Sequence, residues 1–261
     1  MKGKAVELSI VLPTYNEKES IGELIRSLLT VITPRIPEVE VIVVDDHSPD
    51  GTAEVVRREF SDRPEVRLQV RKTEKGLATA IAHGLALARG RHIVVMDTDF
   101  NHHPQDLPRL LALLPEADIV VGSRYVPGGG MKTSRFRYFG SWLFNLFIRL
   151  TLWTPIKDNL SGFLAFKREI LDRLPGRDIF YGYGDYCIRL LHHARRAGLV
   201  IKEVPVVYEF RLGGESKTDF RRQLINYSKA TLALRLRKRP SAAQDKPLKE
   251  RGGGAPKIGN R

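Results

Sequence analysis

The stretch that decides the fold runs from Arg91 to Asn101 and reads Arg-His-Ile-Val-Val-Met-Asp-Thr-Asp-Phe-Asn. Its apolar run is too short for a free-standing helix, and its β-branched residues favour a buried strand. The strand ends in two carboxylates, Asp97 and Asp99, in a position where open α/β sheets bind ligands. Two neighbouring acids repel each other unless a cation lies between them. The pattern therefore favours a hard cation such as Mg²⁺ held on a nucleotide diphosphate, with a solvated helix-capping turn as the alternative.

Strand-like and helix-like segments alternate on both sides of this stretch. Further strands are predicted at residues 7–13, 39–44, 66–70 and 119–123. Helices are predicted at residues 20–30, 78–88 and 105–114, and a further helix is predicted to begin near residue 52. This alternation is typical of an α/β fold with a mostly parallel sheet flanked by helices. Because the carboxyl ends of such strands share one edge, the polar residues that follow them are expected to line one cleft.

Composition narrows the class of partner. The chain of 261 residues has a formal net charge of +13, which indicates a partner with phosphates: nucleic acid, anionic lipid headgroups or a phosphorylated substrate. Cys187 is the single cysteine, so no internal disulfide is possible. No run of 18 apolar residues is present, and we expect no transmembrane helix. The Gly-rich signatures of NAD-binding Rossmann domains and of P-loops are absent after the first strand.

Three blocks, at residues 11–17, 43–52 and 96–99, resemble the inverting family-two glycosyltransferases, which have the Rossmann-like GT-A fold. Residues 122–126, the glycines 128–130, Arg137, Ser141 and residues 211–217 are similar to the dolichol-phosphate mannose synthases of that family. The resemblance covers about residues 6–235. It implies mannose transfer with inversion from GDP-mannose to dolichyl or polyprenyl phosphate, with Mg²⁺ or Mn²⁺ as cofactor.

The resemblance also implies roles for residues at matching positions. The metal ligands are Asp97, Asp99 and Asn101, the last standing where relatives often have glutamine. The nucleotide-binding residues are Pro13, Tyr15, Glu17, Asp45, Asp46, Lys75, Asp97, Thr98 and Lys217. The catalytic residues, which hold the phosphates, are Asp99, Arg124, Arg137, Ser141 and Arg211. The sugar and acceptor loop residues are Asp158, Ser161, Asp185 and Ser216.

Two helical segments suggest where a lipid acceptor would approach. Residues 135–153 mix aromatic and aliphatic residues with three arginines, as interfacial amphipathic helices do; a buried core helix is the alternative. Residues 219–238 predict a basic helix, either on anionic lipid or as a solvated face. We therefore expect one GT-A domain over residues 1–240 and a disordered basic tail over 241–261.

These expectations describe a peripheral protein on the cytoplasmic face of a membrane, with small membrane-anchoring subunits as candidate partners and no nucleic acid. Two kinds of alternative stay open. One, within the enzyme class, is a polyprenyl-phosphate glucosyltransferase that uses UDP-glucose, because no residue of the sequence identifies the base of the nucleotide, or a family-two transferase with a glycan acceptor. The other, from a different class, is a basic nucleic-acid-binding module, although no signature of such a module is present.

Overall fold

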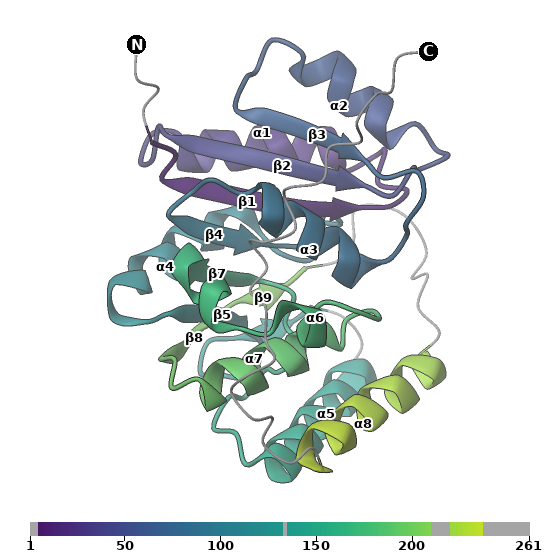
Figure 1. Ribbon diagram of the computed structural model, residues 1–261, viewed down its shortest axis with the longest axis vertical. Coiled ribbons are helices and arrows are strands. Elements are labelled where there is room, and N and C mark those ends of the chain that lie inside the picture. Colours follow the sequence, from purple (N-terminus) through teal and green to yellow (C-terminus); the bar gives the residue numbers. More distant parts are fainter. Residues whose placement is uncertain (1–4, 133–134, 210–219, 237–261) are drawn as a thin grey trace, which may run out of the picture.

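The computed structural model describes residues 5–132, 135–209 and 220–236. At its centre lies a seven-stranded sheet in the order β3-β2-β1-β4-β7-β5-β8 (Figure 1). A two-stranded sheet, β6-β9, lies beside it. The strands are β1 (Leu8–Thr14), β2 (Val39–Asp45), β3 (Val66–Val70), β4 (His92–Val95), β5 (Ile119–Ser123), β6 (Gly130–Met131), β7 (Leu164–Lys167), β8 (Ile201–Pro205) and β9 (Val207–Tyr208).

The sheet is mostly parallel, which confirms the α/β prediction. Parallel pairing joins β1 with β2 and β4, β2 with β3, and β5 with β8. The one exception among these central strands is β7, which runs antiparallel between β4 and β5. The strand predicted within residues 91–101 (β4) and the strand predicted at 119–123 (β5) are therefore not neighbours, because a later segment of the chain inserts between them. β4 and β5 still point the same way, so their carboxyl ends share one edge.

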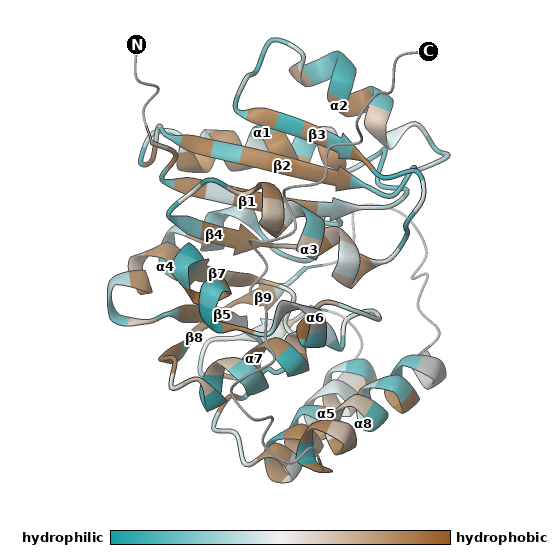
Figure 2. Ribbon diagram, viewed as in Figure 1, coloured by the Kyte–Doolittle hydropathy of each residue, from teal (hydrophilic) through white to brown (hydrophobic). Residues whose placement is uncertain are grey.

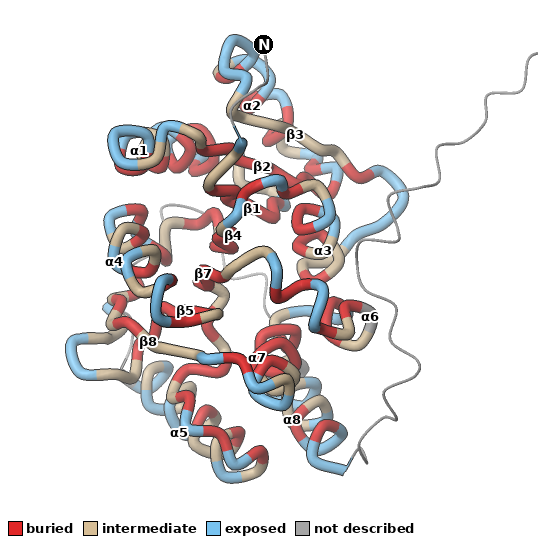
Figure 3. The backbone as a smooth tube through the Cα atoms, turned by 60° about the vertical axis from the view of Figure 1, so that its left-hand side comes forward, coloured by how far each residue is buried: buried red, intermediate tan, exposed pale blue. Residues whose placement is uncertain are grey.

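Helices cover both faces of the sheet (Figures 1 and 3). One apolar cluster joins the sheet to α1, α2 and α4, and a second joins the opposite face to α3, α6 and α7. The central strands are apolar along most of their length (Figure 2), as strands buried on both faces must be. These helices are α1 (Ile21–Ile32), α2 (Thr52–Phe60), α3 (Leu77–Leu87), α4 (Leu107–Ala112), α6 (Gly176–Ile179) and α7 (Tyr186–Arg196).

The helix predicted at 105–114 is shorter than expected. Only α4 is α-helical there, and it lies between two 3₁₀ turns, η1 (Pro104–Asp106) and η2 (Leu114–Glu116). Pro108 and Pro115 are the second residues of α4 and η2, because proline fits the first turn of a helix but disrupts its interior. A third 3₁₀ segment, η3 (Arg168–Arg173), follows β7.

Two long helices, α5 (Arg135–Leu152) and α8 (Phe220–Leu236), pack side by side beyond the sheet (Figure 1). Their shared core contains Ile148, Leu152 and Leu234, with Ile188 of α7. They match the two predicted segments at 135–153 and 219–238, whereas the predicted tail at 241–261 lies outside the described residues. Among the described residues, no helix is both long enough and apolar enough to cross a membrane.

A buried carboxylate ties the first strands together. Glu40 of β2 accepts hydrogen bonds from Ser9 Oγ of β1 at 2.7 Å and from Arg67 Nη1 of β3 at 2.8 Å. It also accepts the backbone N–H of Arg89 at 2.7 Å, just before β4. Burial raises the pKa of Glu40, but these hydrogen bonds outweigh it and hold the pKa below its ordinary value. The network therefore ties together the amino-terminal ends of β1, β2 and β3 and the segment before β4, at the edge of the sheet opposite the cleft.

Replacing this carboxylate should destabilise the fold. We expect Glu40→Gln to lower the free energy of unfolding by about 1 to 3 kcal/mol, because buried donors lose a charged acceptor. The measurement is urea unfolding at neutral pH. Glu23→Gln is the matched control, since Glu23 pairs with Arg26 at the surface and its loss should cost below about 0.5 kcal/mol. Equal effects of the two substitutions would contradict the assigned role of Glu40.

Candidate active site

A cavity of about 860 Å³ lies at the carboxyl ends of β1, β2, β4 and β5. Side chains from the predicted nucleotide, metal and phosphate groups line it together, although they come from segments more than 100 residues apart. The predicted residues that line it are Pro13, Tyr15, Glu17, Asp46, Lys75, Asp97, Thr98, Asp99, Asn101, Arg124, Arg137 and Ser141.

The loop after β1 forms one wall of the cavity. Asn16 adopts a left-handed conformation (φ 57°), which turns the chain sharply after the strand. The backbone N–H of Asn16 donates to Ser48 Oγ at 2.9 Å, and that of Glu17 to Thr52 Oγ1 at 2.9 Å. Lys75 Nζ lies 5.1 Å from the centre of the Tyr15 ring. The loop is thus held by the segment after β2 and presents an aromatic face beside a cation.

Asp45 and Asp46 are placed differently. Asp45 is fully buried, accepts the Ser48 N–H at 3.0 Å, and does not line the cavity. Asp46 lines the cavity, where it accepts from Arg71 Nε at 2.7 Å and from the Gly76 N–H at 2.6 Å. Asp45 therefore supports the loop at Ser48. Of the two acids, Asp46 is the one that could contact a nucleotide directly.

The segment after β4 carries the candidate metal ligands. Phe100 is left-handed (φ 61°), and this turn brings Asn101 back beside Asp99. The Asn101 amide nitrogen donates to Asp99 Oδ2 at 2.7 Å, so its amide oxygen is the atom left to face a cation. Among the described residues, no three Asp, Glu, His or Cys side chains converge as a protein-only metal cage. Two carboxylates and one amide oxygen on a cavity wall nevertheless fit Mg²⁺ or Mn²⁺, which commonly take further oxygens from substrate phosphates.

His102 lies behind these ligands. Its Nδ1 accepts the backbone N–H of Asp97 at 3.0 Å, and its ring packs between Phe163 and Tyr208. Burial lowers its pKa to about 4, against the raising effect of the Asp99 charge. The imidazole is therefore neutral near pH 7 and positions Asp97 rather than acting as a zinc ligand or a base.

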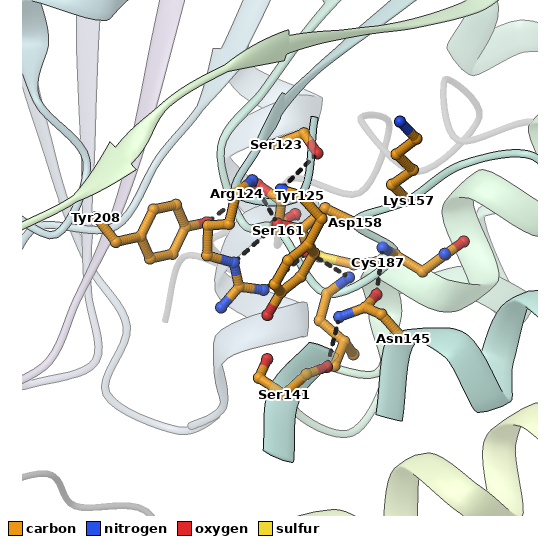
Figure 4. A network of polar contacts seen from close by, with 12 residues as sticks. Ser123, Arg124, Tyr125, Ser141, Asn145, Lys157, Asp158, Ser161, Cys187 and Tyr208 are labelled. Carbon is orange, nitrogen blue, oxygen red and sulfur yellow. Dashed lines mark hydrogen bonds and ion pairs between the residues drawn. The ribbon is translucent and has the colours of Figure 1, made fainter. Parts of the chain in front are cut away.

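Arg124, directly after β5, is held by a buried carboxylate (Figure 4). Asp158 accepts from Arg124 Nε and Nη2, both at 2.8 Å, and from its backbone N–H at 3.0 Å. Burial would lower the pKa of Arg124, but Asp158 raises it well above the ordinary value. The guanidinium also lies 4.6 Å from the centre of the Tyr208 ring. Nη1 takes no part in these bonds, so the cation is fixed while one of its nitrogens remains available to an anion.

The predicted sugar and acceptor residues that the structure describes, Asp158, Ser161 and Asp185, do not line the cavity. Asp158 pairs with Arg124, and Ser161 Oγ donates to the Gly122 carbonyl at 2.6 Å. Asp185 forms an ion pair with Arg189 and accepts the Tyr183 N–H at 2.8 Å. Their direct binding of sugar has no support in this geometry, because each carboxylate or hydroxyl is already engaged by the protein. Three predicted residues lie outside the described residues: Arg211, Ser216 and Lys217.

Several lining residues were not predicted from sequence. They come from α5, from the loop before β7, from the loop before α7, from β9 and from α8: Phe144, Leu160, Tyr183, Tyr208, Gln223, Leu224 and Tyr227. The Tyr-Gly-Tyr-Gly run at 181–184 is the signal that could have found Tyr183, since its two glycines indicate a loop and loops often carry binding residues. The residues of α8 carry no local signal, because only the packing of α8 against α5 and α7 brings them to the cavity.

Comparison with known proteins gives consistent results. The model of the family described as glycosyl transferase family 2 matches residues 9–174. An undecaprenyl-phosphate mannosyltransferase of Micrococcus luteus is 37% identical over 214 residues, which span 79% of this chain and 85% of that protein. A dolichol-phosphate mannosyltransferase of Saccharomyces cerevisiae is 32% identical over 82% of this chain and 81% of that protein. A dolichol-phosphate mannosyltransferase of Pyrococcus furiosus is 34% identical over 81% of this chain and 59% of that protein.

Among solved structures, a glucosyl-3-phosphoglycerate synthase of Mycobacterium tuberculosis superposes with a TM-score of 0.67. It was crystallised with Mn²⁺, UDP-glucose and phosphoglyceric acid. The two proteins are 21% identical, and the match covers 94% of this chain and 90% of that one. At this identity the likeness shows the fold alone.

Removing the partner of Arg124 should destabilise the protein strongly. We expect Asp158→Ala to lower the free energy of unfolding by about 3 to 5 kcal/mol, because it leaves a buried guanidinium without its counter-charge. Urea unfolding measures this loss. Glu116→Ala, which breaks a surface pair with Lys202, is the control and should cost below about 0.5 kcal/mol. A loss near 1 kcal/mol for Asp158→Ala would show that the pair is solvated rather than buried.

The depressed pKa of His102 should make stability depend on pH. The folded value of about 4 lies below the ordinary 6.5, so the unfolded chain binds the proton first as pH falls. His102 should therefore cost about 2 kcal/mol of stability between pH 7 and pH 5. We expect His102→Phe to remove that part of the pH dependence, as measured by urea unfolding at both pH values. An unchanged dependence would contradict the buried neutral imidazole.

Proposed function

The chain belongs to glycosyl transferase family 2 and has the GT-A fold, and from this premise we propose that it transfers mannose from GDP-mannose to a polyprenyl phosphate such as dolichyl phosphate. The observation that carries the proposal is that one cavity combines acids, a fixed cation and apolar side chains. Asp97, Asp99 and Asn101 line it after β4 and Arg124 lines it after β5, whereas its apolar end, at α5 and α8, is lined by Phe144, Leu160 and Leu224. A sugar diphosphate suits the acids, and a phosphate on an apolar chain suits the cation and the apolar end.

The donor would lie along the walls formed by β1, β2 and β4. Tyr15 offers a face for a base, and Asp46 and Lys75 lie on the same side of the cavity. Asp97, Asp99 and Asn101 would hold Mg²⁺ or Mn²⁺, which supplies positive charge to the departing diphosphate. Asp97 is oriented for this role by His102, through the hydrogen bond at its backbone N–H.

The acceptor needs cations rather than a base. A phosphate monoester is largely dianionic at neutral pH, so it can attack the anomeric carbon without giving up a proton. Its approach to a negatively charged donor is opposed by charge repulsion. Arg124 is fixed by Asp158 in a cavity wall, and Arg137 of α5 lines the same space. Two guanidinium groups can bind phosphate oxygens and remain charged throughout. A single in-line displacement of this kind inverts the configuration of the anomeric carbon of the sugar.

A membrane is the proposed source of the acceptor. Large apolar side chains are exposed on both long helices: Phe136, Phe139, Leu143 and Leu150 on α5, Ile225, Leu232 and Leu236 on α8, and Trp153 just after α5. Phe136 and Leu236 are exposed by 83% and 79%. We propose that this apolar surface, which borders the apolar end of the cavity, lies in the headgroup region of a bilayer on its cytoplasmic side. Peripheral attachment of this kind requires no spanning helix.

GDP-mannose rests on the mannosyltransferase relatives, and UDP-glucose is the competing donor. The structural relative that was crystallised with UDP-glucose has the same fold, so the fold does not separate the two. Membership in a transferase family leaves the nucleic-acid-binding alternative without support.

The proposal is tested by incubating the protein with polyprenyl phosphate, Mn²⁺ or Mg²⁺ and radiolabelled GDP-mannose or UDP-glucose. We expect label to enter the organic-soluble lipid from GDP-mannose. Asp99→Asn should lower the rate by about 10² to 10³-fold, because the diphosphate loses its charge compensation. Glu116→Ala, far from the cavity lining, is the control and should keep the wild-type rate. Label from UDP-glucose alone, or full activity of Asp99→Asn, would overturn the donor or the metal assignment.

A further inference from the structure

A second, smaller pocket lies behind the phosphate end of the main cavity. Its volume is about 220 Å³, room for several groups the size of a water molecule, each of which occupies about 30 Å³ in the liquid. One stripe of α5 forms its floor, and Tyr125 and the segment before Asp158 close it. The lining residues are Tyr125, Trp142, Asn145, Leu146, Arg149 and Lys157. None of these residues has a role in the proposed transfer.

Two buried polar atoms of this pocket meet no partner among the described residues. The Nε of Arg149 is shielded from solvent and makes no hydrogen bond there. The hydroxyl of Tyr125 is also shielded; it points toward Ser141 (Figure 4) but reaches no atom with hydrogen-bond geometry. Most buried polar groups in proteins are paired, and an arginine cannot lose its charge to avoid the cost. A permanently charged donor in this pocket, with a hydroxyl at its border with the main cavity, therefore points to an anionic ligand.

The remaining charges around the pocket favour an anion. Lys157 adds a second positive side chain to the lining, and Asn145 adds an amide. The nearest acids are already engaged. Asp158 is held by Arg124, and Glu203 accepts the backbone N–H groups of Lys157 and Asp158 at 2.9 and 3.0 Å. Among the described residues no carboxylate forms an ion pair with Arg149 or Lys157, so their charge is not neutralised within this part of the protein.

The pocket also borders the apolar surface of α5. Trp142 lines the pocket, and its ring stacks on that of Phe139 at 5.7 Å between centroids. Phe139 is exposed and belongs to the apolar surface proposed to face the bilayer. Positions 142, 145, 146 and 149 follow one another at helical spacing, and positions 139, 143 and 150 form the adjacent stripe. A group that enters the pocket would therefore come from the level of lipid headgroups.

We propose that this pocket binds a phosphate group distinct from the acceptor phosphate, and that its source is an anionic phospholipid of the membrane. Arg149 holds the phosphate through Nε and the adjoining nitrogen, and the Tyr125 hydroxyl donates a further hydrogen bond. The lipid source depends on the proposed action at a membrane, whereas the phosphate site itself does not. Occupation would anchor α5 beside the main cavity and so hold the acceptor entrance at the headgroup level.

The test measures binding of the full chain to phosphatidylcholine vesicles with and without phosphatidylglycerol, in the absence of donor and of polyprenyl phosphate. The informative variant is Arg149→Lys, which keeps the charge but loses Nε and the planar fork. We expect it to weaken binding to the anionic vesicles about tenfold, nearly as much as Arg149→Gln. Arg235→Lys, an exposed residue near the end of α8, is the matched control and should bind as the wild type does.

A parallel titration with inorganic phosphate, followed by ³¹P NMR, separates the two sources. Phosphate binding that Arg149→Lys weakens, without any effect on vesicle binding, would support the site and identify free phosphate as its ligand. Vesicle and phosphate binding that are both unchanged in Arg149→Lys would overturn the proposal, because general charge attraction would then account for membrane binding. Tyr125→Phe, which removes no charge, provides a second variant if Arg149→Lys fails to fold. These readouts involve no sugar transfer, so they can fail while the proposed activity stands.

Discussion

A buried guanidinium at the end of β5 is the constraint on which the site depends. Taking Arg124 out of water costs free energy that only a close counter-charge can offset, and Asp158 supplies it through three hydrogen bonds. Asp158 is itself fixed by Glu203 of β8. The sheet, the loop before β7 and the cation are therefore positioned as one unit. Because the positive charge is fixed before any ligand binds, the binding of an anionic ligand would require no further free energy to orient it.

The sequence alone predicted the first half of the fold well. Short apolar runs ending in acids alternate with amphipathic segments, and strands β1 to β5 and helices α1 to α3 lie close to the predicted positions. Convergence of Asp46, Asp97 and Asp99 on one cavity followed from the parallel direction of the strands. The sequence did not predict that Asp45 would be buried away from the cavity while Asp46 lines it. The chain bends where β2 ends, so strand alternation no longer tells which neighbour faces the cavity.

The second half was beyond local reasoning. β7 has four residues, Leu164–Lys167, and nothing within them signals antiparallel insertion between two parallel strands. That placement depends on contacts with β4 and β5, which are distant in sequence. Asp158 and Asp185 were expected to face a sugar or an acceptor because of the resemblance to the family. The structure instead pairs each with an arginine, Arg124 and Arg189, and such pairing is invisible without the fold.

The division of the cavity between two parts of the chain bears on how specificity arises. The family model matches residues 9–174, and this segment supplies the loop after β1, the acids after β4 and the cation after β5. Residues beyond it supply Tyr208, Gln223, Leu224 and Tyr227, and Leu224 of α8 belongs to the apolar end. The pairing of α8 with α5 adds an apolar wall to a cavity whose acids and cation come from the segment that the family model matches. The proposed acceptor side can therefore differ between relatives without a change in the strands of the proposed donor side.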